Sequence, residues 1–138
     1  MSLSELISPL IGRWLLAWYF LSQGWALAND WNHTVLDMLA HGLPVAPLLL
    51  ALALLVMLLG SLSLILGYQT RYGAVMLFAL VVLSSIAMHA FWLMHSPAQQ
   101  AQYELFARNL AIAGGLLLLV GMGPGRFALD NRPPPKRR

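Results

Sequence analysis

The sequence predicts an all-α membrane protein built as a four-helix transmembrane bundle. Of its 138 residues, 59% are hydrophobic and only 9% are charged, whereas about 25% of the residues in soluble domains are charged. Four apolar stretches, 7–28, 44–67, 72–93 and 105–122, reach or approach the roughly 20 residues that a helix needs to cross a bilayer. Because they use most of the chain, we expect a single transmembrane domain over residues 1–131 and a basic tail over residues 132–138.

The first stretch, 7–28, is interpreted as a retained transmembrane helix. Ala26-Leu27-Ala28 resembles a signal-peptide cleavage site. A signal peptide also needs positive charge at its start, and no Lys or Arg precedes Arg13 here. Arg13 lies about one turn inside the helix. Its long side chain can reach the nearer membrane surface, so an anchoring role and a functional role are both open.

Aromatic side chains are frequent in this first helix. Trp14 and Trp25 lie towards opposite ends of the span, which is typical of the aromatic belts at the two membrane interfaces. Trp18 lies near mid-depth. Trp18 and its neighbour Tyr19 are candidates for stacking on the flat ring of a ligand, with contact to lipid as the alternative for Trp18.

The connection 29–43 predicts a short helix on the outer membrane surface. Thr34 followed by Asp37 resembles a helix start, and Gly42 before Pro44 resembles a helix end. The Val, Leu and Met side chains between them would face the membrane.

The second stretch, 44–67, carries no charge and consists almost entirely of Leu, Ala and Val up to Gly60. A tight turn leads to the third stretch, 72–93. Three side chains share one face near its outgoing end: Ser85, His89 and Trp92. Pro97 in the following polar loop prevents the third helix from continuing into the fourth.

The fourth stretch, 105–122, has charged residues at its start. An arginine at the centre of a membrane helix costs about 3 kcal/mol or more, so we expect Arg108 near an interface, against other helices, or beside a partner. Glu104 lies one turn before it, and positions 104, 108, 111 and 115 form one stripe of the helix. We expect this stripe to face the other helices, because small residues allow close packing, and the run 116–119 to face lipid.

Basic residues gather at one end of the predicted bundle. Arg71 lies in the second connection, and five more follow the fourth stretch: Arg126, Arg132, Lys136, Arg137 and Arg138. The opposite end receives Asp30, Asp37 and Glu104, with Arg108 as a candidate positive charge. Since cytoplasmic segments collect Lys and Arg, we expect both termini in the cytoplasm. The proline-stiffened tail is then a topology determinant that touches anionic lipid, with docking of a specific partner as the alternative.

In this orientation, polar side chains from three helices converge near the outer surface: Gln23, His89, Glu104, Arg108 and Asn109. In a low-dielectric bundle such groups satisfy one another, and a cluster of this kind is a hypothesis for a ligand site. The alternative is that the cluster only fixes the register of the helices.

Several kinds of chemistry have no support in the sequence. The chain has no cysteine, which excludes a thiol or disulfide mechanism. The spacings of 8 residues between His33 and His41 and of 6 between His89 and His95 do not fit helical ligand pairs, so we expect no metal site. Phosphate-binding glycine loops, nucleophile motifs and paired carboxylates are also missing. The net charge of +3 comes from residues that set the topology, so we expect no nucleic-acid partner.

Short motifs along the chain resemble those of the DoxX (DoxX/DoxD-like) family. The most specific is the run Gly123-Pro124-Gly125-Arg126-Phe127-Ala128-Leu129-Asp130. Weaker matches are Gly12-Arg13, Leu43-Pro44, Gly60, Leu66-Gly67, Thr70-Arg71, His89, Arg108-Asn109 and Gly114-Gly115. The resemblance covers nearly the whole chain and implies a small four-helix protein of the bacterial inner membrane.

The better-known members of this family include a subunit of a thiosulfate:quinone oxidoreductase and a membrane partner of redox-defence enzymes. The resemblance therefore implies quinone as a candidate ligand, and a redox protein or a second copy of the chain as a candidate partner. Relatives often carry a glutamate in the second helix shortly before the glycine, where Met57 or its neighbours stand here. Loss of that carboxylate weakens the inference of proton-coupled quinone chemistry.

The leading hypothesis is a membrane subunit of a quinone-linked redox system, with the polar cluster as a pocket in the outer leaflet. One alternative is a scaffold that recruits partner proteins and does no chemistry. Another is a small-solute carrier, which is less favoured because neither discontinuous helices nor repeats are visible.

Overall fold

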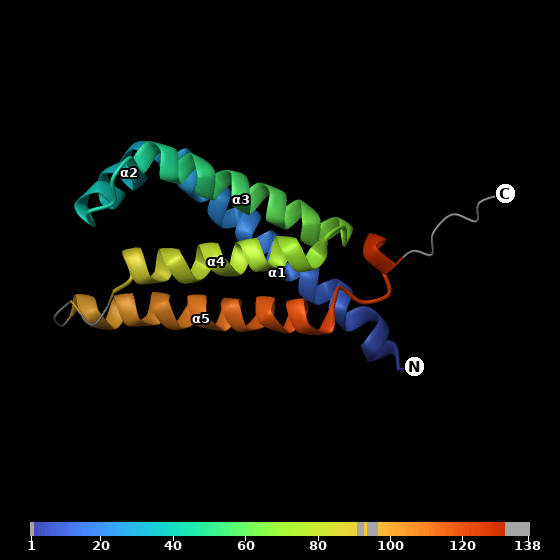
Figure 1. Ribbon diagram of the computed structural model, residues 1–138. Helices are drawn as coiled ribbons and strands as arrows, with labels where there is room; N and C mark the ends of the chain where they lie inside the picture. Colours follow the sequence, from blue (N-terminus) through green and yellow to red (C-terminus); the bar gives the residue numbers. More distant parts are fainter. Residues whose placement is uncertain (1, 91–92, 94–96, 132–138) are drawn as a thin grey trace.

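The computed structural model describes residues 2–90, 93 and 97–131. The α-helices are α1 (Leu3–Asn29), α2 (Trp31–Ala40), α3 (Ala46–Leu66), α4 (Thr70–Met88) and α5 (Ala98–Met122), and a short 3-10 helix, η2 (Leu129–Asn131), follows α5. These described residues contain no β-strand, which agrees with the predicted all-α fold class. The start of α1 and η2 lie at one end of the molecule, and α2 lies at the opposite end (Figure 1). The predicted tail 132–138, Trp92 and His95 lie outside the described residues.

Within the described residues, three helices are long and apolar enough to cross a membrane: α3 with 21 residues, α4 with 19 and α5 with 25. α1 is longer, at 27 residues, but it does not reach the hydropathy of these three helices over a membrane-spanning length. The prediction of several membrane spans therefore has support from three helices, while the fourth span stays a prediction.

Some helix ends differ from the predicted ones. α2 begins at Trp31, after Asp30, and not at Thr34, whose hydroxyl donates to the backbone oxygen of Asp30 over 2.8 Å. α4 ends at Met88, so His89 is the residue that follows the helix. α5 begins at Ala98 and not at residue 105, because the polar segment before the apolar stretch continues the same helix.

The four long helices pack in the order α1, α3, α4 and α5, each along the next. Gly60 and Gly73 let α3 and α4 approach closely. A Cβ on Gly60 would lie 2.6 Å from Cγ of Leu77, and one on Gly73 would collide with the Ser63 side chain. All four helices contribute to one core: Ala17, Phe20, Leu64, Ala74, Leu77, Val81, Ala113, Leu116 and Leu119.

The inner face of α5 differs from the predicted one. Its buried residues are Asn109, Ala113, Leu116 and Leu119. The predicted inward stripe is wrong, because Glu104, Arg108 and Ala111 are exposed and Gly115 is only half-buried. The run 116–119, predicted to face lipid, contains two of the buried residues. Since residues 110–122 of α5 are apolar on every side, hydropathy does not mark the side that packs against α4.

Candidate functional site

A buried hydrogen-bonded link joins α1, α4 and α5. The amide nitrogen of Asn109 donates to the hydroxyl of Ser85 over 2.9 Å, and the hydroxyl of Tyr19 donates to the amide oxygen of Asn109 over 3.5 Å. Asn109 and Ser85 are both buried, and their pairing satisfies polar groups that would be costly to leave unpaired among hydrocarbon. Because α5 begins at Ala98, this link lies in the middle part of α5 and not at its start.

Arg108 lies beside this link, against the ring of Tyr19. The central carbon of its guanidinium is 5.8 Å from the ring centroid, within the range of about 6 Å for a cation–π interaction. The side chain is exposed, and in the described part of the chain it forms no ion pair with Glu104, one turn away. Tyr19 therefore contacts Arg108 through its ring and Asn109 through its hydroxyl.

His89 follows α4 and has a different partner. Its Nδ1 is 2.8 Å from Oε1 of Gln102 on α5, so this ring nitrogen is the donor of the pair. Gln102 precedes Asn109 by about two helical turns, which makes the pairs His89–Gln102 and Ser85–Asn109 successive polar contacts between α4 and α5. Sequence analysis does not identify Gln102 or Ser85 as these partners, because the pairing depends on the register of two separate helices.

The remaining predicted site residues lie apart from this link. Gln23 is half-buried on α1 and Glu104 is exposed on α5, and neither side chain forms a hydrogen bond or ion pair among the residues described. Trp18 is 69% exposed, which agrees with the alternative of lipid contact. Of the predicted set, the structure brings together Tyr19, Arg108 and Asn109. Over the described ranges, no three His, Asp or Glu side chains gather as a metal site requires.

An apolar groove of about 290 Å³ lies between α1 and α3. It is lined by large apolar side chains that include Leu21, Leu54 and Met57, and by Phe20, whose ring meets the Tyr19 ring edge-on at 5.3 Å. This lining suits an acyl or isoprenoid chain. It does not suit a polar head group, because it offers few hydrogen-bonding side chains.

At the opposite end of the bundle, Arg13 is buried inside the protein. It is 1% exposed, and its Nη1 donates to the backbone oxygen of Leu64 over 3.2 Å and its Nη2 to that of Phe127 over 2.6 Å. These bonds tie α1 to α3 and to the segment after α5. The interpretation in which Arg13 reaches the membrane surface is therefore wrong, because two neighbouring segments supply carbonyl acceptors inside the protein.

Gly67 provides the space for this arginine. It follows α3 with a φ of 69°, a conformation that residues with a Cβ rarely adopt. A Cβ at this position would collide with Nη1 of Arg13 and with Ala128. Glycine is therefore required here by both the backbone conformation and the packing.

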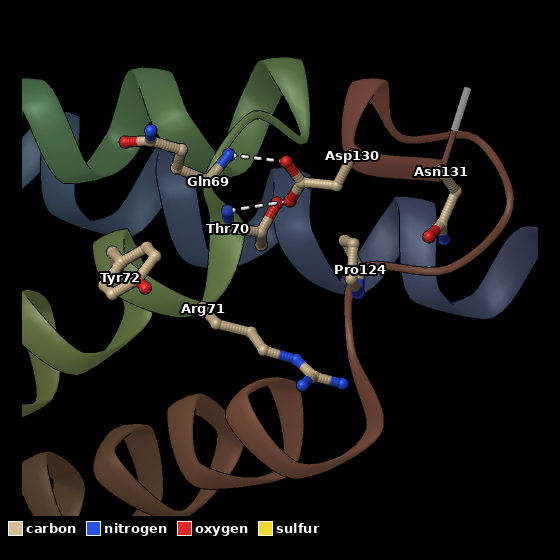
Figure 2. Close-up of a pocket in the computed structure, with 7 residues that line it drawn as sticks. All are labelled: Gln69, Thr70, Arg71, Tyr72, Pro124, Asp130 and Asn131. Carbon is tan, nitrogen blue, oxygen red and sulfur yellow. Dashed lines mark hydrogen bonds between the residues drawn. The ribbon is translucent and has the colours of Figure 1, made fainter. Parts of the chain in front are cut away.

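Asp130 caps the start of α4 from a distant part of the chain. Its Oδ1 accepts from the N–H of Gln69 over 2.6 Å and its Oδ2 from the N–H of Thr70 over 2.9 Å (Figure 2). Gln69 provides no side-chain cap of its own, so this carboxylate replaces a local N-cap. Partial burial raises the pKa of Asp130, but the N–H groups of Thr70 and Gln69 and the charge of Arg13 outweigh it and hold the pKa below its ordinary value.

The run 123–130, which sequence analysis recognises only as a motif, thus has a structural role. Gly125, with a φ of 83°, approaches α1 so closely that a Cβ would lie 2.6 Å from Cβ of Pro9. Phe127 accepts from Arg13, and Asp130 both caps α4 and donates its N–H to the backbone oxygen of Gly67 over 2.9 Å. Because these polar groups are used by one another, the run 123–130 serves the architecture, whereas the exposed guanidinium of Arg108 forms no hydrogen bond with the described residues.

Comparison with known proteins finds relatives over most of the chain. The sequence model of the DoxX family matches residues 8–90, and that of the SURF4 family matches residues 61–134. "Inner membrane protein YqjF" of Escherichia coli K12 is 29% identical over 127 residues, which cover 92% of each chain. "Inner membrane protein YphA" of the same organism is 29% identical over 123 residues, covering 89% of this chain and 88% of the relative.

A further similarity covers only part of the chain. "Surfeit locus protein 4 homolog" of Drosophila melanogaster is 33% identical over 69 residues, which are 49% of this chain and 26% of that protein. No solved structure matches the chain.

Proposed function

Because the chain belongs to the DoxX family of membrane proteins, we propose that it is a multi-pass inner-membrane subunit of a quinone-linked redox system, with a polar pocket in the outer leaflet. The two bacterial relatives are named inner membrane proteins and cover most of this chain. We include α1 as a fourth span, because it packs along α3 and contributes to the common core. Both termini are assigned to the cytoplasm, since the start of α1 and η2 lie at the same end of the molecule (Figure 1). Arg71 lines a cavity with Asp130 of η2, and Arg126 lies shortly before η2, so this end also carries exposed arginines, as cytoplasmic segments do.

The observation that carries this proposal is the exposed guanidinium of Arg108 against the ring of Tyr19. A quinone head group is a flat ring with carbonyl acceptors. Arg108 supplies several N–H donors for those acceptors, and Tyr19 supplies an aromatic surface. Asn109 holds the hydroxyl of Tyr19 and thereby orients its ring. An arginine with no acidic partner in the described part of the chain is costly in the middle of a membrane helix, which favours a functional role.

Quinone bound at this place would accept or donate electrons. The chain has no cysteine that could serve as its own redox group, so the electrons would come from a partner protein. Proton transfer would also depend on other groups, because the resemblance implies a glutamate at Met57 or one of its neighbours that this chain lacks, and Met57 itself lines the apolar groove. The residues of this chain therefore bind and orient the head group in our proposal, and the groove between α1 and α3 accepts a lipid chain.

Extraction of bound quinone tests this function. Protein solubilised gently from quinone-containing membranes should carry quinone that mass spectrometry can quantify. Arg108→Ala should lose this quinone while keeping its helical circular dichroism. Arg126→Ala removes the same charge at the opposite end and should keep the quinone. Wild-type protein without quinone, or an Arg108→Ala variant that retains it, would contradict the proposal.

A second candidate is a scaffold that recruits partner proteins, and one surface of α5 favours it. Gly114 and Gly121 lie on one face of this helix, and a Cβ added at either would meet nothing within 4 Å. Small residues are where membrane helices approach one another, so this face suits a helix of a partner or of a second copy. If the chain is a scaffold, Gly114→Leu should abolish co-purification of the partner. If the chain is a quinone-binding subunit, Gly114→Leu should leave the amount of bound quinone unchanged.

A further inference from the structure

A second cavity lies at the η2 end of the bundle, away from Arg108. It has a volume of about 320 Å³ and lies between the start of α4 and the segment after α5. Its lining includes Arg71, Tyr72, Pro124 and Asp130. Figure 2 shows the side chain of Arg71 extending from α4 towards the end of α5, away from the carboxylate of Asp130. The cavity therefore has a cation on one side and an acid on the other.

Asp130 and Arg71, the two charged residues of this cavity, differ in whether they have hydrogen-bond partners. Both oxygens of Asp130 accept backbone N–H groups at the start of α4. Arg71 is exposed and forms no ion pair in the ranges that the structure describes. The cavity thus offers an unpaired guanidinium, whereas its carboxylate is already bound.

The position of Arg71 on α4 also needs an explanation. It lies in the first turn of the helix, where the dipole is positive and a cation is unfavourable. Its Nη2 lies 3.5 Å from where a Cβ on Gly123 would be, next to the negative end of α5. This contact places the guanidinium at the cavity, but its N–H groups make no hydrogen bond with the described residues. An anion in the cavity would therefore be attracted by Arg71, since the start of α4 is already capped by the carboxylate of Asp130.

We propose that this cavity binds the phosphate group of an anionic membrane lipid, with the guanidinium of Arg71 as its main contact. The planar fork of N–H donors in arginine matches two oxygens of a phosphate. Tyr72, beside Arg71, is 73% exposed, and tyrosine is typical of the depth at which lipid head groups lie. Basic pockets next to membrane helices bind anionic head groups for the same reasons. The proposal is independent of the quinone site.

Thermal unfolding of the full chain in a neutral detergent, followed by tryptophan fluorescence, tests this inference. Short-chain phosphatidylglycerol should raise the unfolding temperature with a saturable dose dependence, and short-chain phosphatidylcholine should not. Arg71→Gln should weaken the apparent affinity for phosphatidylglycerol by about tenfold or more, because charge-assisted hydrogen bonds are lost. Arg71→Lys keeps the positive charge but lacks the planar N–H donors of arginine, so it should weaken the affinity for phosphatidylglycerol less than Arg71→Gln does.

Arg126→Gln is the matched control, because it removes one exposed arginine at the same end without touching the lining of the cavity. It should bind phosphatidylglycerol nearly as the wild type does. Equal losses in Arg71→Gln and Arg126→Gln would mean general surface attraction and would overturn the proposal. Stabilisation of the protein by inorganic phosphate alone, at concentrations where the lipid has no effect, would assign the cavity to a free anion and overturn the role of a lipid.

Discussion

Replacing Asp130 by asparagine removes the charge that caps α4 and keeps the size of the side chain. The carboxylate accepts two backbone N–H bonds, at 2.6 and 2.9 Å. In the variant, the uncharged amide oxygen can accept only one of the two backbone N–H groups. The amide nitrogen, which is a donor, then faces the other N–H group. Hydrogen bonds to charged groups contribute about 1.5–3 kcal/mol and an N-cap about 1 kcal/mol. Because Asp130 is exposed, we expect the unfolding free energy to fall by only about 1–2 kcal/mol.

This loss of stability should depend on pH with a defined sign. The pKa of Asp130 in the folded protein lies below its ordinary value. Its carboxylate therefore stabilises the fold fully above the unfolded pKa of about 3.9, and this stabilisation is lost as the pH falls through the folded pKa. The wild type and Asp130→Asn should differ most near neutral pH and converge as the pH falls below about 4.

Reversible unfolding in detergent, followed by tryptophan fluorescence at several pH values, measures this difference. Asp30→Asn is the matched control, because Asp30 pairs with the exposed His33 at 3.5 Å. Surface pairs of this kind contribute about 0–1 kcal/mol, so the control should remain close to the wild type. An Asp130→Asn variant as stable as the wild type at neutral pH, or a deficit that does not shrink in acid, would refute the reasoning.

Two further predictions concern the same end of the bundle. Gly67→Ala should lower the unfolding free energy by about 2 kcal/mol or more, because its φ of 69° is strained for alanine and its Cβ would collide with Arg13. Gly121→Ala has open space at its Cβ and should stay within about 1 kcal/mol of the wild type in the same unfolding assay. Arg13→Met should lower stability by about 3 kcal/mol, because the carbonyl oxygens of Leu64 and Phe127 lose their donors. Amide hydrogen exchange should then increase over residues 127–130, and unchanged protection there would show that Arg13 does not hold this segment.

The sequence by itself determined the class of protein and most of its helical segments. A long apolar stretch crosses a bilayer as an α-helix, because the helix bonds every backbone polar group within the segment. The second stretch, expected over residues 44–67, is α3 (Ala46–Leu66). The resemblance to the DoxX family is confirmed by the match over residues 8–90. Hydropathy did not determine which side of α5 faces inward, because residues 110–122 of that helix are apolar on every side.

Only the tertiary structure decided where each polar side chain finds its partner. Sequence analysis expected Arg108 to face the other helices and allowed Arg13 to reach the surface, whereas the structure buries Arg13 and leaves Arg108 exposed against Tyr19. The acceptors of Arg13 lie 51 and 114 residues away in the chain, and Asp130 caps a helix that starts 60 residues before it. A local pattern of hydropathy shows that a charge will be costly in a membrane, but the partners that offset this cost come from distant segments and are known only when those segments pack together.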